Sequence, residues 1–288
     1  MSNTTVQRGS GWSIKLVYNL YKLFGYRFVY YLMYPVTFFY FIFASNVKIA
    51  LRDYYKHLNK PFGNKVYFHH LRHFAICMCD RFISKVDSND YTFELINYEE
   101  FYSSLDCGGI IAMSHIGGWA TAGNSFRDYP MNIVMQEVML EEIKQIEDSI
   151  EKTVSNVKVI DLSKDPIKAT IDIANALIDN ELVAMMVDRV TVPKHSKSLL
   201  FFGKEAAFNK NPFEIAYKTQ KPIIALFVVY QKPQVYKIEF VRISMDKSKE
   251  QDDEIQNAMQ VYINKLEEIV SKNPEQWFNF YNFWEEGK

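Results

Sequence analysis

The chain has 288 residues, 48% of them hydrophobic, with 22 Phe and 19 Tyr but only 11 Gly and 9 Pro. This composition excludes a disordered or collagen-like chain and is sufficient for a large core. The three cysteines, two of them spaced Cys77-x-Cys79, form neither a disulfide framework nor a zinc motif, which is typical of the reducing cytosol.

The net charge of −1 is unevenly distributed along the chain. Residues 1–60 carry eight Lys or Arg against one acid, Asp53, so the remainder carries about eight excess negative charges. Such an asymmetry indicates a polyanionic partner or a membrane surface. We expect an anionic membrane surface and no nucleic acid.

The first 60 residues predict helices that contact a membrane. Residues 12–26 have apolar side chains at helical spacing, and the uncharged run from Phe28 to Val47 has the length of a membrane span. Pro35 interrupts that run, and its four tyrosines favour the headgroup region. We therefore expect a kinked helical hairpin in the interface rather than a span, with a buried core helix as the alternative. No signal-peptide cleavage site follows the run.

This pattern divides the chain into an N-terminal helical membrane-associating segment, 1–60, and a main domain, 61–288. Residues 47–85 predict further helix, and we interpret His69 and His73 within it as a packed or solvated helix face rather than a metal site. Tyr91 to Tyr102 is a mixed segment that leads into the first clear strand.

From residue 108 onward, strands and helices alternate. Residues 234–243 alternate in polarity after the short Lys232-Pro233 link, which indicates an antiparallel hairpin. The pattern predicts a single α/β layered domain with a central mixed, mostly parallel sheet flanked by helices. The other expected strands are 108–113, 132–135, 157–160, 182–187 and 223–230, and the expected helices are 119–126, 140–152, 166–179, 212–219 and 252–270.

Two strand ends carry polar side chains. His115 follows the strand 108–113, and Asp188-Arg189 follows the strand 182–187. If these strands are neighbours, both groups overhang one crevice at the carboxyl edge of the sheet. His115 is then placed to act as a general base, with a structural histidine as the alternative. Asp188 is an acid, a metal ligand or a structural partner of Arg189, whereas Ser114 points to the opposite face.

A third region, Phe201-Phe202-Gly203, predicts a tight turn packed under the sheet. Lys194, His195 and Lys197 precede it as a basic loop that either binds phosphate or is solvated. The chain contains no P-loop, no dinucleotide-binding glycine motif and no nucleophile elbow.

Four blocks stand in one order along the chain: Ser114–Trp119, Val187–Arg189, Phe201–Gly203 with Ala206, and Asn273–Phe278. Together they resemble the late lipid A acyltransferases of the glycerolipid acyltransferase superfamily, over essentially the whole chain. The resemblance implies acyl transfer from a thioester of acyl carrier protein or coenzyme A to a hydroxyl or amine of a membrane lipid. It implies no cofactor and no metal.

The resemblance also implies roles for individual residues. His115 removes the proton of the acceptor, and backbone amides near Gly117 and Gly118 stabilise the oxyanion. The remaining residues expected to contact substrate are Trp119, Arg189, Phe202 and Gly203.

The sequence departs from the family pattern at two places. Ala120 stands five residues after His115, where the family has an acid that orients the histidine. Either Ala120 is an engineered inactivation, or another acid reaches His115, or the chain has lost transferase chemistry. Asp188 is the candidate substitute, with Glu137 and Asp128 behind it. The second departure, Gln136–Leu140 in place of an arginine-containing segment, favours an aminolipid, a lysolipid or a polyene-type lipid over a phosphorylated lipid A precursor.

The sequence therefore predicts an acyltransferase at the cytoplasmic face of the bacterial inner membrane, peripheral or shallowly inserted, with His115 as its base. A catalytically silent protein that binds lipid or acyl carrier protein is the alternative. Hydrolysis of the thioester by water is a third possibility.

Overall fold

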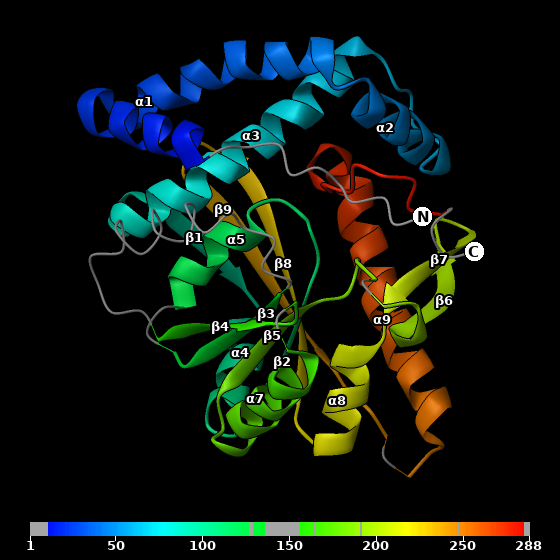
Figure 1. The fold of residues 1–288 in the computed structure, drawn as a ribbon. Helices are drawn as coiled ribbons and strands as arrows, with labels where there is room; N and C mark the ends of the chain where they lie inside the picture. The colour runs from blue at the N-terminus through cyan, green and yellow to red at the C-terminus, as the bar shows by residue number, and fades with distance from the viewer. Residues whose placement is uncertain are drawn as a thin grey trace.

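The computed structural model describes residues 11–126, 129–135, 156–163, 165–190, 192–246 and 248–284. The expected helix 140–152 lies outside these residues, as do Asp128, Glu137 and the segment 136–140. In the described part of the chain, helices pack against a central sheet, and three N-terminal helices lie across one end of it (Figure 1).

The sheet has seven strands in the order β1-β9-β8-β2-β5-β3-β4. Its five strands from β8 to β4 run parallel, β8 pairs antiparallel with β9, and β1 pairs parallel with β9. This confirms the predicted mixed, mostly parallel sheet. The strands are β1 (Thr92–Ile96), β2 (Gly109–Met113), β3 (Met131–Met135), β4 (Val157–Asp161), β5 (Leu182–Met186), β8 (Ile223–Lys232) and β9 (Val235–Ile243).

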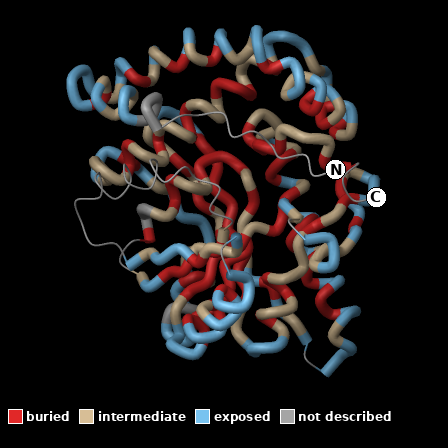
Figure 2. Tube along the Cα trace, in the orientation of Figure 1, coloured by how far each residue is buried: buried red, intermediate tan, exposed pale blue. Residues whose placement is uncertain are grey.

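The buried strands separate two hydrophobic cores, because successive side chains of a strand point to opposite faces. On β2, Ile110 and Ala112 pack into one core and Ile111 into the other. Buried residues accordingly concentrate on the central strands (Figure 2). The first core is covered by α7 (Pro166–Ile178), α8 (Asn211–Thr219) and α9 (Gln251–Lys272), and the second by α3 (Asn64–Val86), α4 (Tyr98–Leu105) and the short α5 (Trp119–Ala122) with η2 (Gly123–Phe126).

The N-terminal helices are broken at other places than the sequence predicted. Helix α1 (Gly11–Phe43) continues through Pro35 and loses helical geometry at Gly25, where φ is 75°. Ala44 separates it from α2 (Ser45–His57). Within the described residues no single helix has the length and apolar character of a membrane span, whereas α1 from Lys15 and α2, bent by 88°, meet both criteria together. The division at residue 60 stays a prediction.

Two regions contain helices or strands that the sequence pattern did not predict. The mixed segment Tyr91–Tyr102 contains β1 and the start of α4. The expected tight turn at Phe202-Gly203 joins two strands, β6 (Ser196–Phe201) and β7 (Lys204–Asn209), in a separate antiparallel hairpin. Phe202 and Gly203 both have positive φ, 51° and 74°, as a two-residue hairpin turn with the twist of its strands requires.

Helix α3 is tied to the sheet and to α1 through one carboxyl group. Asp80 is fully buried and accepts hydrogen bonds from the hydroxyls of Tyr236 (2.5 Å), Tyr91 (2.9 Å) and Tyr26 (3.4 Å). Burial raises the pKa of Asp80 to about 6, although the three phenols act in the opposite direction. The folded state therefore binds this proton more tightly than the unfolded chain does.

Because the pKa of Asp80 is raised from 3.8 to about 6 on folding, its contribution to stability is present below about pH 4 and is lost as the pH rises through about 6. Asp80→Asn removes this contribution, so we expect its free energy of unfolding to fall less between pH 4 and 6 than that of the unsubstituted chain. Urea titrations at several pH values measure the difference. The matched surface change Asp253→Asn supplies the baseline, and parallel profiles for all three proteins would contradict the role of Asp80.

Candidate active site

His115 and Asp188 meet because β2 and β5 are parallel neighbours. The last residue of β2, Met113, is paired with the last residue of β5, Met186, and Val187 N–H donates to Met113 C=O at 2.8 Å. The two polar residues therefore leave the same edge of the sheet side by side. Their adjacency depends on strand order, which the sequence did not reveal.

The His115 ring is hydrogen-bonded to a fully buried carboxylate. His115 Nδ1 lies 2.8 Å from Asp188 Oδ1, and the backbone N–H of His115 donates to Oδ2 at 2.8 Å. The Asp188 side chain has no exposed surface, whereas 14% of the His115 side chain is exposed. Asp188 is thus held inside the protein, whereas the His115 side chain is partly exposed.

Two residues near the C-terminus complete the shell around Asp188. Trp277 Nε1–H donates to Oδ2 at 2.9 Å, and Asn279 Nδ2–H donates to the same oxygen at 3.1 Å. Four N–H groups therefore surround one carboxylate, as a buried charge requires. Trp277 lies in the fourth sequence block, but no pattern in the sequence indicated a role for either residue.

The charge of Asp188 determines which nitrogen of His115 carries the proton. Burial raises the pKa of Asp188, but the adjacent His115 ring, its hydrogen bonds and Arg189 outweigh burial and hold this pKa at about 2. The carboxylate is ionised at neutral pH and accepts hydrogen bonds only, so a neutral His115 carries its proton on Nδ1. Its Nε2 then has a free lone pair, which is the arrangement of a general base.

The C-terminal segment is paired with the turn that carries His115. Gly117 N–H donates to Gln276 C=O and Phe278 N–H donates to His115 C=O, both at 2.8 Å. The Gln276 side chain, in turn, is bonded to both backbone groups of Tyr230 on β8. The turn is therefore fixed from the sheet and from the C-terminus.

The two glycines of the turn leave no room for a side chain. Gly117 has φ of 52°, and an added Cβ would lie 2.1 Å from Val228 C=O. A Cβ on Gly118 would lie 2.3 Å from the Tyr236 ring. Of the backbone amides expected near Gly117 and Gly118 to stabilise an oxyanion, that of Gly117 already donates to Gln276 C=O.

The other candidate residues differ in how they contact the His115–Asp188 pair. The Trp119 ring lies 5.2 Å from the His115 ring, edge to face. Arg189 is exposed, with its guanidinium 5.8 Å from the Tyr281 ring. Phe202 packs on Phe201 (4.7 Å), which in turn packs on Trp277 (5.3 Å).

The Phe-Phe-Gly block thus touches the site through the packing of Trp277. Gly203 completes the hairpin turn that carries Phe202. Ala120 lies in α5 and offers no acceptor to His115, so Asp188 is the acid that the ring contacts.

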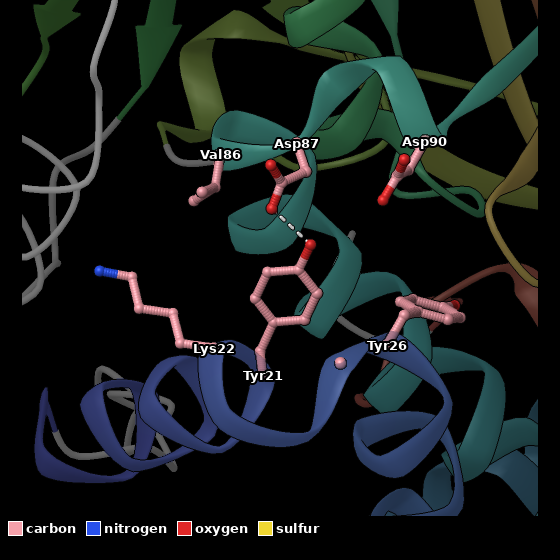
Figure 3. Close-up of a pocket in the computed structure, with 7 residues that line it drawn as sticks. Tyr21, Lys22, Tyr26, Val86, Asp87 and Asp90 are labelled. Carbon is pink, nitrogen blue, oxygen red and sulfur yellow. Dashed lines mark hydrogen bonds between the residues drawn. The ribbon is translucent and has the colours of Figure 1, made fainter.

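A cavity of about 380 Å³ lies elsewhere, between α1 and the end of α3 (Figure 3). Tyr21 reaches across it and donates to Asp87 at 2.5 Å, while Lys22, Tyr26 and Asp90 also line it. None of its lining residues comes from the turn after β2 or from the Asp188 shell, so we assign it no part in the chemistry of His115.

Residues 78–286 match the family model of the bacterial lipid A biosynthesis acyltransferases. The chain belongs to this family. A crystal structure of the 1-acyl-sn-glycerophosphate (LPA) acyltransferase PlsC from Thermotoga maritima is similar with 12% identity and a TM-score of 0.40, over 87% of this chain and 100% of that one. A search among curated proteins finds no match.

Replacing Trp277 tests the shell around Asp188. Trp277→Phe keeps an aromatic ring but removes a hydrogen bond to a buried charge, so we expect a loss of about 1.5–3 kcal/mol in the free energy of unfolding. Trp284→Phe is the matched control, since Trp284 Nε1–H donates to the neutral carbonyl of Phe201. For it we expect about 0.5–1.5 kcal/mol. Equal losses in urea titrations would argue against a special role of the Asp188 shell.

Proposed function

We propose that this family member transfers a fatty acyl chain from a thioester to a hydroxyl or amine of a membrane lipid. The donor is the acyl thioester of acyl carrier protein or of coenzyme A. The observation that carries the proposal is the 2.8 Å contact between Nδ1 of the partly exposed His115 and a fully buried Asp188, which places the proton of a neutral ring on Nδ1 and leaves Nε2 unprotonated. No enzyme nucleophile is required, because the acceptor itself attacks the thioester.

In this mechanism Nε2 of His115 takes the proton from the acceptor hydroxyl as its oxygen attacks the thioester carbonyl carbon. The carbonyl π electrons move onto oxygen, and a tetrahedral intermediate forms. When the intermediate collapses, the carbon–sulfur bond breaks and the sulfur leaves with the bonding electrons. The imidazolium then returns the proton to the sulfur, which yields a free thiol and the acylated lipid.

Asp188 supports both halves of this cycle as a positioning residue. Its carboxylate fixes the Nδ1–H tautomer and stabilises the imidazolium that exists between the two proton transfers. We assign it the role that the acid five residues after the histidine has in related sequences. Ala120 is then compatible with an active enzyme, because the acid comes from the end of β5 instead of from α5.

The Gly118 amide is the backbone donor that we assign to the oxyanion, since the Gly117 amide is occupied. Trp119, Arg189 and the Phe202-Gly203 turn are proposed to contact substrate. Because residues 136–140 lie outside the described part of the chain, the preference for an aminolipid, a lysolipid or a polyene-type acceptor rests on sequence alone.

We further propose that α1 brings the site to the cytoplasmic face of the bacterial inner membrane, as a peripheral or shallowly inserted element. Its outer face exposes large apolar side chains, including Phe38 (56%), Phe39 (57%) and Phe43 (64%). Aromatic rings of this kind favour the boundary between headgroups and acyl chains. The excess positive charge of residues 1–60 adds attraction to anionic lipid.

The catalytic roles are tested by incubating the protein with an acyl thioester and extracted bacterial lipid. We expect His115→Ala to lower the transfer rate by about 10²–10⁴-fold, because the general base is lost. We expect Asp188→Asn to lower it by up to ~10⁴-fold, because the wrong tautomer is favoured. His69→Ala, which removes an imidazole from α3, is the control for loss of a histidine. Transfer unaffected by His115→Ala would refute the assigned role.

Ala120→Glu separates the proposed function from its alternatives. With Asp188 already bonded to Nδ1, the added carboxylate is expected to give no increase in rate. Transfer that appears only in this variant would mean that the site lacks a working acid. If no variant transfers acyl groups from either donor, a silent lipid- or carrier-binding protein is favoured. Free fatty acid released without acceptor would indicate hydrolysis.

Membrane contact through α1 is tested by co-sedimentation with vesicles of phosphatidylethanolamine and phosphatidylglycerol. Replacing Phe38, Phe39 and Phe43 by Ser removes apolar surface from the proposed contact, and we expect binding at least about tenfold weaker. The matched control replaces three exposed isoleucines of α7, Ile167, Ile171 and Ile178, by Ser. Equal binding by both triple variants would contradict the assignment of α1.

A further inference from the structure

Arg72 is a cation buried in the middle of α3, where it is 6% exposed. Its Nε and Nη2 are enclosed and have no hydrogen-bond partner in the part of the chain that the structure describes. Among the residues that the structure describes, no carboxylate forms an ion pair with it. Removing a charged group from water costs several kcal/mol unless hydrogen bonds and an opposite charge compensate it.

Two tyrosines of α1 offset part of this cost. The guanidinium carbon lies 4.0 Å from the centre of the Tyr34 ring and 4.5 Å from that of Tyr30. Such cation–π contacts stabilise a desolvated cation. They satisfy none of its N–H groups, however, because a ring face is no substitute for an oxygen acceptor. In the described part of the chain, Nε and Nη2 of the planar fork therefore lack an oxygen acceptor, and phosphate is the anion that the fork matches best.

A second polar group at the same interface is also unsatisfied. Thr37 is 1% exposed, and its hydroxyl has no hydrogen-bond partner among the described residues. It follows Tyr34 by three residues and so lies on the same face of α1, toward α3. A hydroxyl donor and a guanidinium on facing helices are suited to share one oxyanion.

We propose that Arg72, with Tyr30 and Tyr34, binds the phosphate of an anionic glycerophospholipid. Helix α1 supports a lipid as the source of the phosphate, because Tyr31 (65% exposed) and Phe38 (56% exposed) present apolar surface on its outer side. A headgroup that reaches between α1 and α3 leaves its acyl chains against that outer side. The choice of a lipid rests on the membrane contact proposed for α1, whereas the anion site rests on Arg72 alone.

Thermal unfolding of the full chain tests the site without using catalysis or vesicles. The probes are water-soluble dihexanoyl phosphatidic acid, dihexanoyl phosphatidylcholine and inorganic phosphate, at constant ionic strength. We expect phosphatidic acid at about a hundred times its Kd to raise the unfolding temperature by about 5–10 °C, and the other two to raise it less. Arg72→Met is expected to abolish this rise while its own unfolding temperature, without lipid, stays equal or increases.

The matched control is Arg52→Met, which removes the same charge from an exposed position on α2 and is expected to keep the response. Should Arg72→Met fail to fold, Arg72→Lys keeps the charge, loses the planar fork and is expected to bind about tenfold more weakly. An equal rise with inorganic phosphate would overturn the lipid as the source. An equal rise with phosphatidylcholine, or a response kept by Arg72→Met or lost in Arg52→Met, would overturn the site.

Discussion

The hydrogen bonds to the buried carboxylate of Asp188 are the interaction on which the arrangement around His115 depends. A charge without solvent must be surrounded by donors, and here they come from the turn after β2 and from two residues beyond α9. The C-terminal segment therefore has to return across the sheet and pair with the His115 turn. Packing of Trp277 on Phe201 and Tyr54 then joins the β6–β7 hairpin and α2 to the same centre.

Asp188 stands on a more rigid element than an acid at position 120 would. An acid on α5 would be carried by a helix of four residues, whereas Asp188 extends from a central strand of the sheet. A strand buried on both faces holds its end more rigidly than a short helix does. The turn after β2 lies against β8 and Tyr236, which leave no room for a side chain at Gly117 or Gly118. The contact between His115 and Asp188 therefore depends on the spacing of β2 and β5.

The fold and the site were predictable to different degrees. Alternation of apolar runs and helical patterns identified most strands, because burial on both faces leaves a clear signal in the chain. The strand β1 was missed since it lies at the sheet edge and its residues are mostly exposed. His115 and Asp188 were recognised at strand ends, but their contact follows from strand order, and the roles of Trp277 and Asn279 follow from contacts across some 90 residues of chain. Such long-range pairing leaves no local pattern in a single sequence.

Helix α3 lies between the proposed lipid face and the turn that carries His115. Through Arg72 it contacts α1, and two turns further along Asp80 accepts the hydroxyl of Tyr236. The ring of that tyrosine occupies the space beside Gly118, the residue whose amide we assign to the oxyanion. Both contacts come from buried polar residues of one helix, and each joins α3 to another part of the fold. Helix α3 therefore fixes the position of α1 and that of Tyr236 beside Gly118 within one packed interior.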